Sequence, residues 1–148
     1  MSIPDVIHDS IITADGHKYT GEMKTIEGVV GLVFEGKGEI AYTNGDRYEG
    51  AFVRNQRSGA GTLTYADGGS YEGEWHNDMR HGCGSLTEAS GSVFEGTFVE
   101  DKKHGMGMES LASGESYTGK FDGNMRHGRG ILDLPDGSVY EGHFVQNF

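Results

Sequence analysis

Hydrophobic and polar residues alternate over short stretches of this chain, and the segment YEGEW at 71–75 shows the pattern clearly. Tyr71, Gly73 and Trp75 take every second position, and Glu72 and Glu74 lie between them. Successive side chains of a β-strand point to opposite faces, so the pattern predicts a half-buried strand. The rings and the glycine share one face, and the two glutamates share the other.

The residues that follow predict a hairpin. The polar segment 76–81, HNDMRH, predicts a turn, and 82–88, GCGSLTE, predicts a second strand with Gly82, Gly84 and Leu86 on one side. The next turn, ASG, ends in a glycine that can adopt positive φ. We therefore expect one β-hairpin in this stretch, with strands of five to six residues.

The same motif, aromatic-x-Gly-x-apolar, recurs along the chain. The leading aromatics are separated by 29, 23, 23, 23 and 23 residues, and they are Tyr19, Tyr48, Tyr71, Phe94, Tyr117 and Tyr140. Paired glycines recur in the same phase as Gly59/Gly61, Gly82/Gly84, Gly105/Gly107 and Gly128/Gly130. Regular self-similarity indicates a repeat protein. The sequence predicts an all-β fold: an elongated, single-layer antiparallel meander of tandem 23-residue β-hairpins.

The glycines inside the strands have a predicted packing role. A single sheet has no second layer, so its aromatic rings must pack along the sheet itself. Glycines on adjacent strands leave gaps in which a ring can lie against the backbone. We therefore expect Gly73→Val or Gly96→Val to damage packing more than Glu72→Ala.

Composition narrows the functional classes. The 148 residues carry a net charge of -11, which argues against nucleic acid as the main partner because phosphate binding needs a basic face. The single Cys83 cannot form an internal disulfide and fits a reducing compartment. The sequence has no apolar run of membrane-spanning length and no basic, signal-like N-terminus. These features favour a cytoplasmic protein, one that could also associate with the cytoskeleton or a membrane.

The combined motif resembles a known family. Y-E-G-x-W/F followed by N-x-x-x-H-G-x-G and D-G, at 23-residue spacing, is similar to the MORN (membrane occupation and recognition nexus) repeat. The resemblance implies a twisted single-layer array of hairpins. It also implies non-enzymatic roles, as scaffolds at the cytoskeleton or membrane or as modules attached to other domains.

We expect residues 1–14 to form an N-terminal segment or cap and residues 15–148 to form the repeat array. The first repeat has a six-residue insertion, and the last is incomplete. The apolar stretch 26–38 in the insertion predicts a longer hairpin that buries Val29, Val30, Leu32 and Phe34, or else an exposed apolar patch.

Two surfaces are candidate binding sites. The aromatic face could form a groove for a partner's peptide or helix, or it could simply be the core. Its residues are Tyr48, Phe52, Tyr71, Trp75, Phe94, Phe98, Tyr117 and Phe121. Cations near the predicted turns could form a ridge along one edge that binds anionic lipid. They are Arg54, Arg57, Arg80, Lys102, Lys103 and Arg126.

The open C-terminal strand suggests an edge-to-edge homodimer near Tyr140, Phe144 and Phe148. We expect no metal or cofactor, since adjacent repeats hold their histidines roughly 10 Å apart. The segment GLVFEGKG at 31–38 ends in glycine where a phosphate loop needs Ser or Thr.

The sequence favours a non-catalytic scaffold for protein–protein interaction, in a cytoskeletal or membrane-apposed complex. The alternatives are a peripheral membrane module that binds anionic phospholipids and the targeting module of a longer enzyme. We expect no enzymatic activity from this chain, because no nucleophile or acid–base pair lies in a recognisable catalytic motif.

Overall fold

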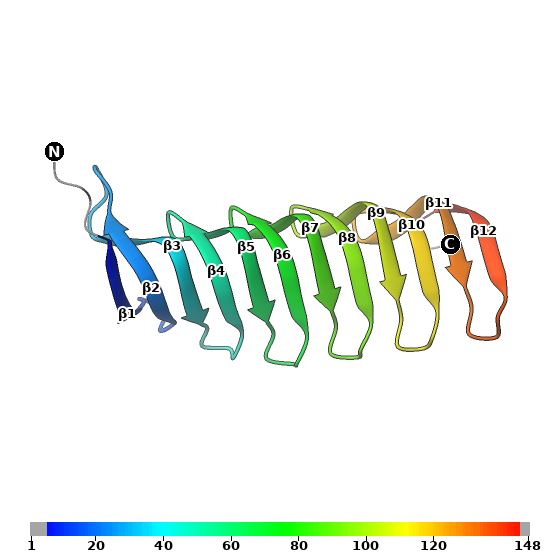
Figure 1. Ribbon diagram of the computed structural model, residues 1–148, viewed down its shortest axis with the longest axis horizontal. Coiled ribbons are helices and arrows are strands. Elements are labelled where there is room, and N and C mark those ends of the chain that lie inside the picture. Colours follow the sequence, from blue (N-terminus) through cyan, green and yellow to red (C-terminus); the bar gives the residue numbers. More distant parts are fainter. Residues whose placement is uncertain (1–5, 146–148) are drawn as a thin grey trace.

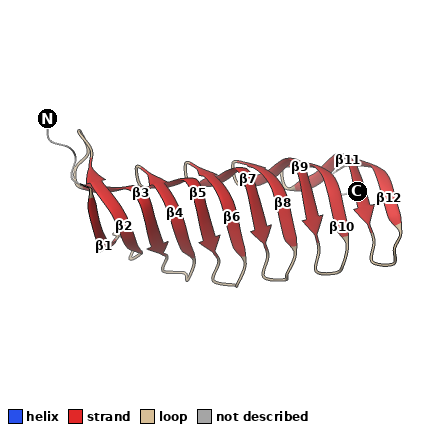
Figure 2. Cartoon of the chain, viewed as in Figure 1, coloured by secondary structure: helices blue, strands red, loops and turns tan. Residues whose placement is uncertain are grey.

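The computed structural model describes residues 6–145, which form a single row of antiparallel strands in sequence order (Figure 1). Within this range, Figure 2 shows strands and loops and no helix. The strands are β1 (Ile7–Ile12), β2 (Lys18–Thr25), β3 (Leu32–Ala41), β4 (Arg47–Val53), β5 (Gln56–Thr64), β6 (Ser70–His76), β7 (Met79–Thr87), β8 (Val93–Val99), β9 (Lys102–Ser110), β10 (Ser116–Asp122), β11 (Met125–Asp133) and β12 (Val139–Phe144). The predicted fold class is confirmed.

The hairpin turns are shorter than the sequence analysis predicted. Asn77 and Asp78 alone connect β6 to β7, both with positive φ (49° and 66°), as in a type I′ turn. The second strand therefore begins at Met79 instead of Gly82. The same two-residue turns join β4 to β5, β8 to β9 and β10 to β11. Strands are consequently longer than expected, seven to nine residues in the regular repeats.

Five-residue loops connect the hairpins along the opposite edge. In the loop Tyr42–Asp46, the Tyr42 amide donates to the Asp46 carbonyl (2.9 Å) and the Gly45 amide donates to the Tyr42 carbonyl (3.1 Å). Gly45 has φ of 97°, and the equivalent loop glycines also have positive φ, as predicted. These loops return the chain so that every strand pairs with its sequence neighbours.

The N-terminal segment extends the sheet. β1 pairs antiparallel with β2, and Asp9 lies opposite Gly21. Residues 7–12 of the expected N-terminal segment or cap thus add a strand at the end of the array. β1 occupies the place of a second hairpin strand, but it carries Ile7 and Asp9 where the later strands carry paired glycines.

Candidate functional site

The aromatic rings form a continuous ladder inside the molecule. From Tyr48 to Phe144, ring after ring meets the next edge to face, with centroids 4.9 to 5.4 Å apart. Pairs with this geometry each stabilise by about 0.5–1.5 kcal/mol beyond the apolar area they bury. The ladder thus provides the hydrophobic core that a single-layer sheet would otherwise lack.

The eight rings proposed as a partner groove are this core. Their exposed fractions lie between 0% and 4%, and they are Tyr48, Phe52, Tyr71, Trp75, Phe94, Phe98, Tyr117 and Phe121. The core interpretation accounts for them, and the rings do not line an open groove. A partner approaching this face would meet the side chains that lie over the rings.

Glycines give the rings their space, as the spacing predicted. A Cβ on Gly84 would lie 2.3 Å from the Tyr71 hydroxyl, and one on Gly73 would lie 2.5 Å from the Gly84 Cα. The Tyr71 ring lies flat over this pair of glycines, and its hydroxyl donates to the Glu74 carbonyl (2.8 Å). Tyr19, Tyr48 and Tyr117 make the equivalent hydrogen bond.

Burial changes the acidity of these tyrosines. It raises the pKa of Tyr71 to about 12, an effect that the nearby Arg80 partly opposes. Burial, reinforced by the Glu22 carboxylate, likewise raises the pKa of Tyr19 to about 12. The ladder tyrosines are therefore protonated at neutral pH and act as hydrogen-bond donors.

Each two-residue turn clamps the preceding repeat. The Asp101 carboxylate accepts the Arg80 amide (2.8 Å), and the Asp101 amide donates to the Arg80 carbonyl (3.0 Å). Equivalent pairs link Phe34 to Asn55, Arg57 to Asp78 and Lys103 to Asn124. The second turn residue is Asn or Asp each time, because it must accept this amide and tolerate positive φ.

Four of the six cations proposed as a lipid ridge are used within the fold. Arg57, Arg80 and Lys103 form ion pairs with Asp78, Asp101 and Glu109 respectively. Arg126 is 9% exposed and contacts Glu109 and Glu115. These four lie over the rings instead of in the turns, with Arg57 4.5 Å from the Trp75 centroid. Arg54 and Lys102 are exposed at the turn edge.

The first hairpin departs from this pattern. Phe34 lies opposite Met23, at the position that Arg57 and Arg80 occupy in later repeats. Its ring stacks on the Tyr19 ring, with the two centroids 3.7 Å apart. The longer-hairpin interpretation holds for Phe34, which is 9% exposed, but Val29, Val30 and Leu32 are 45%, 103% and 39% exposed. The turn between β4 and β5 contacts the first hairpin at Phe34, whose amide donates to the Asn55 side chain. The loop between β2 and β3 extends beyond this contact, so Val29 and Val30 stay exposed.

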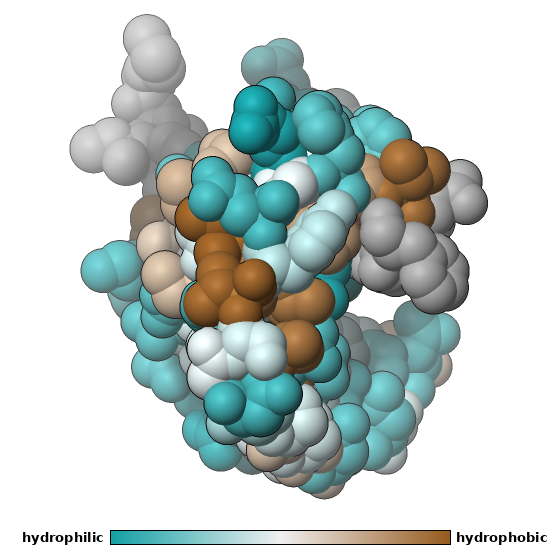
Figure 3. Space-filling view, turned by 90° about the vertical axis from the view of Figure 1, so that its right-hand side faces the viewer, coloured by the Kyte–Doolittle hydropathy of each residue, from teal (hydrophilic) through white to brown (hydrophobic). Residues whose placement is uncertain are grey.

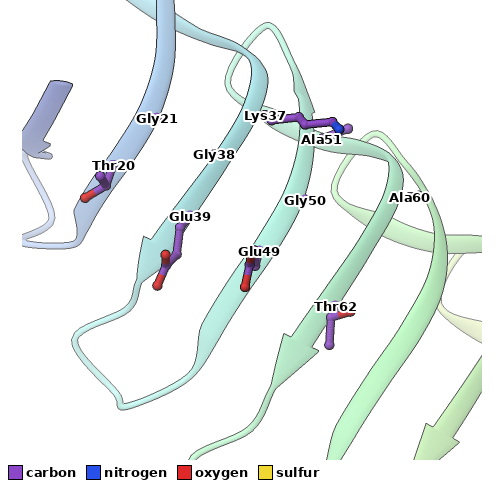
Figure 4. Close-up of a pocket in the computed structure, with 10 residues that line it drawn as sticks. All are labelled: Thr20, Gly21, Lys37, Gly38, Glu39, Glu49, Gly50, Ala51, Ala60 and Thr62. Carbon is purple, nitrogen blue, oxygen red and sulfur yellow. The ribbon is translucent and has the colours of Figure 1, made fainter. Parts of the chain in front are cut away.

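The side of the sheet opposite the rings is hollowed, and it is here called the glycine face because the backbone of the strand glycines lies at the bottom of the hollow. A shallow trough of about 710 Å³ crosses β2 to β5 over Gly21, Gly38 and Gly50. Figure 4 shows Thr20, Glu39, Glu49 and Thr62 on successive strands of this trough, where the register pairs each with the next. Ala51, Ala60 and Lys37 complete its walls.

Apolar side chains are exposed further along the glycine face. Met106, Met108 and Ile131, here called the methionine patch, are 57%, 48% and 39% exposed. Met106 and Ile131 line a second hollow of about 230 Å³, together with Arg129 and Glu141. These residues were not among the sites predicted from the sequence. A comparison of positions 23 residues apart would have found the two methionines. The two preceding repeats carry Ala60 and Thr62, and Cys83 and Ser85, where this repeat carries Met106 and Met108.

Charges surround the methionine patch. Lys120 lies opposite Met106, and Glu95 lies opposite Met108. In the next strand pair, Arg129 faces His143 and Ile131 faces Glu141. The side chains of Glu95, Lys120, Arg129 and Glu141 are all exposed, and no ion pair between described residues involves them.

The C-terminal strand leaves one edge open. β12 pairs with β11 on one side, and it is the last strand of the described residues. Tyr140 is 49% exposed, whereas Phe144 is 4% exposed and packs against Tyr117. Phe148, the third residue of the predicted dimer edge, lies outside the described residues.

Other chemistry is sparse in residues 6–145. They contain no group of three or more His, Cys, Asp or Glu side chains that could hold a metal ion. Cys83 is exposed, and its amide donates to the Glu74 carboxylate (2.6 Å). Within the same residues, no helix could span a membrane.

Two solved structures resemble the chain weakly. One is the TCP domain of SAS-4 (dCPAP) from Drosophila melanogaster in complex with a proline-rich motif of Ana2 (dSTIL). The two sequences are 16% identical, the match covers 93% of this chain and 90% of that chain, and the TM-score is 0.39. The other is a streptogramin B lyase, with 15% identity, 93% and 55% coverage, and a TM-score of 0.19. Neither similarity bears on function.

No curated protein matches the chain. The MORN repeat model matches four consecutive segments, residues 48–70, 71–93, 94–116 and 117–139, which together make up more than half of the sequence. These segments coincide with the hairpins that carry the ring ladder and the turn clamps. The chain therefore belongs to the MORN repeat family.

Proposed function

We propose that this chain is a non-catalytic protein-interaction module that binds a polypeptide segment on its glycine face, centred on the methionine patch. The observation that carries the proposal is the contrast between the two faces. The rings are buried and the cations above them are paired, whereas the glycine face keeps exposed apolar side chains and unpaired charges beside a hollow.

The chemistry of the patch suits a protein partner. Methionine side chains are flexible and polarizable, and they adapt to varied apolar surfaces. Met106 and Met108 lie on β9 and Ile131 lies on β11, with only Thr118 of β10 between Met108 and Ile131, so one apolar side of a bound segment can cover all three. Their burial by a partner would release ordered water and favour binding.

Charge defines the flanks of the bound segment. Glu95 and Glu141 lie at the two ends of the row that contains Met108 and Ile131. Lys120 lies opposite Met106, and Arg129 lies two residues before Ile131 on β11. Electrostatic complementarity between surfaces determines orientation and partner choice. The partner segment should therefore carry apolar residues with acidic residues toward Lys120 and Arg129 and basic residues toward the glutamates.

The lipid alternative has weaker support. Four of the six candidate cations already form ion pairs, and the chain has a net charge of -11. Membership of the MORN family supports a place in a cytoskeletal or membrane-apposed assembly, with the contact made through protein.

Peptide selection on the intact chain tests this function. A phage-displayed library of random peptides would be panned against it, and the selected peptides measured by fluorescence anisotropy. We expect enriched peptides that combine apolar and acidic residues. Their affinity should fall at least tenfold with Met106→Asp/Met108→Asp and with Lys120→Glu/Arg129→Glu.

Arg54→Glu/Lys102→Glu is the matched control, since it reverses two charges at the exposed turn edge, as Lys120→Glu/Arg129→Glu does on the glycine face, and should leave peptide affinity unchanged. Failure to enrich any peptide sequence would overturn the proposal, as would binding that the patch variants do not weaken. Flotation of the wild-type chain with phosphatidylserine vesicles at physiological salt, abolished by Lys102→Glu, would also overturn it in favour of the lipid function.

A further inference from the structure

Each hairpin contains a β-bulge of the same kind. In β6–β7, the single residue Glu74 lies opposite the three residues 81–83. The register shifts at the equivalent place in β2–β3, β4–β5, β8–β9 and β10–β11. The middle one of the three residues, Gly82 in β7, has φ of 85°, and the equivalent glycines also have positive φ. A bulge interrupts the backbone ladder, so an amide in it is available to another acceptor.

Two hairpins fill this bulge with a carboxylate of their own. The Cys83 amide donates to the Glu74 carboxylate (2.6 Å), and in β2–β3 the Lys37 amide donates to the Glu22 carboxylate. A Cβ on Gly82 would lie 2.2 Å from the Glu74 Oε2 atom, so this carboxylate lies directly over the glycine. Hydrogen bonds from an amide to a carboxylate are stronger than those to a neutral acceptor. The bulge therefore acts as a cradle for one carboxylate on the glycine face.

The bulge of β10–β11 has the same backbone but carries a cation instead. Lys120 takes the position of Glu74, and Arg129 takes the position of Cys83. A lysine ammonium group has three donors and no acceptor, so Lys120 cannot accept the Arg129 amide through its side chain. An acceptor for this amide has to come from another group.

The surroundings of this bulge suit an anionic oxygen. A Cβ on Gly128 would lie 3.5 Å from the nearest atom, Lys120 Cδ, so the glycine has room above it. The Lys120 carbonyl already accepts the Tyr117 hydroxyl (2.8 Å). Lys120 and Arg129 bring two positive charges, and His143 lies opposite Arg129 on β12. Figure 3, which views the array from this end, shows hydrophilic side chains around the apolar ones.

We propose that the β10–β11 bulge binds a side-chain carboxylate of the polypeptide segment that covers the methionine patch. The Arg129 amide donates to this carboxylate, and the Lys120 and Arg129 side chains neutralise its charge. The inference rests on the proposed function and assigns one acidic residue of the segment to one place. Met106 lies opposite Lys120, so the residue that covers Met106 lies beside this acid.

The other bulges do not compete for the carboxylate. Glu22 and Glu74 occupy two of them and would repel a second anion. Ala51 and Thr97 stand at the position of Lys120 in the remaining two and bring no positive charge. One acidic residue therefore determines where along the array the segment binds.

Amide NMR of the intact 148-residue chain tests the cradle without a ligand. In Lys120→Glu, the new carboxylate should accept the Arg129 amide, as Glu74 accepts the Cys83 amide. The Arg129 amide proton should then shift downfield and exchange with water more slowly than in the wild type. Lys120→Ala, which reproduces Ala51, is the control and should not slow this exchange. An Arg129 amide that is unaffected by Lys120→Glu would overturn the inference.

Peptides selected on the intact chain test the ligand. Each acidic residue of such a peptide is replaced by the corresponding amide, which keeps the shape and removes the charge. One replacement should weaken binding about tenfold, as expected for loss of a hydrogen bond to a charged group. It should also abolish the downfield shift of the Arg129 amide that the parent peptide causes. The parent peptide should bind Lys120→Glu at least tenfold more weakly, because that chain fills its own bulge.

The inference and the proposed function fail in different ways. Peptides whose affinity depends on Met106 and Met108 but on none of their own acidic residues would overturn the inference and leave the function intact. Absence of any enriched peptide would overturn the function and the assigned ligand together. A slowed Arg129 amide in Lys120→Glu would then still identify the bulge as a carboxylate cradle.

Discussion

The Asp101 carboxylate accepts two hydrogen bonds from Arg80 of the preceding repeat, one from its amide (2.8 Å) and one from its guanidinium Nε (3.1 Å). The Asp101 carbonyl accepts a third from the same guanidinium (2.8 Å). One turn residue thereby fixes the backbone of its neighbour and orients a cation over the Phe98 ring. The contact is local in space but spans 21 residues of sequence.

Replacement of Asp101 tests this clamp. Asp101→Gly keeps the positive φ of the turn but removes the acceptor, so the Arg80 amide and guanidinium lose their partner. The free energy of unfolding should fall by about 1.5–3 kcal/mol, the range for hydrogen bonds to charged groups. Urea denaturation measures the change. Asp101→Asn is the control, since Asn55 and Asn124 make the amide contact in other repeats, and it should lose less.

Phe94 is the one internal leading aromatic without a hydroxyl. Its ring occupies the same place as Tyr71, over Gly96 and Gly107, and the Thr97 carbonyl corresponds to the acceptor of the Tyr71 hydroxyl. Phe94→Tyr should therefore raise the free energy of unfolding by about 0.5–1.5 kcal/mol. Tyr71→Phe should lower it by a similar amount. Destabilisation by Phe94→Tyr would contradict the equivalence of the repeats.

Gly73 and Glu72 allow packing to be separated from surface charge. A side chain at Gly73 would meet the Gly84 backbone and the Tyr71 hydroxyl at 2.5 and 2.7 Å. Gly73→Val should destabilise by about 1–3 kcal/mol or prevent folding. Glu72→Ala, on the exposed face, should stay within about 0.5 kcal/mol. Equal losses in thermal or urea denaturation would show that the glycine does not serve the ring.

Alkaline pH should unfold the array through its tyrosines. Burial raises the pKa of Tyr19 and Tyr71 from 10.0 to about 12. Between those values the unfolded chain loses protons that the folded chain keeps, so stability is intact below pH 10 and falls as pH rises toward 12. Tyrosinate absorbance and circular dichroism, followed together, should change in one transition for the buried rings. Ionisation of all tyrosines before any loss of structure would be inconsistent with their burial.

Sequence predicted the repeat, the ring face and the glycine role correctly, because these depend on alternation and spacing within one hairpin. It misplaced Arg80 in a turn, since a polar run does not reveal that Asn77 and Asp78 alone make the turn. The inward position of Arg80 depends on Asp101 of another repeat. For Val30 the sequence left two alternatives, burial in a longer hairpin or exposure in an apolar patch, and the side chain is exposed because its loop extends past the adjacent hairpin.

The separation of the two faces has an evolutionary consequence. Residues that hold the array together lie on the ring face and in the turns, whereas equivalent positions on the glycine face carry Ala60 and Thr62, Met106 and Met108, or Arg129 and Ile131. Duplication of a hairpin lengthens the array without disturbing its packing. Binding preference can then diverge one repeat at a time, so length and recognition are inherited as separate traits.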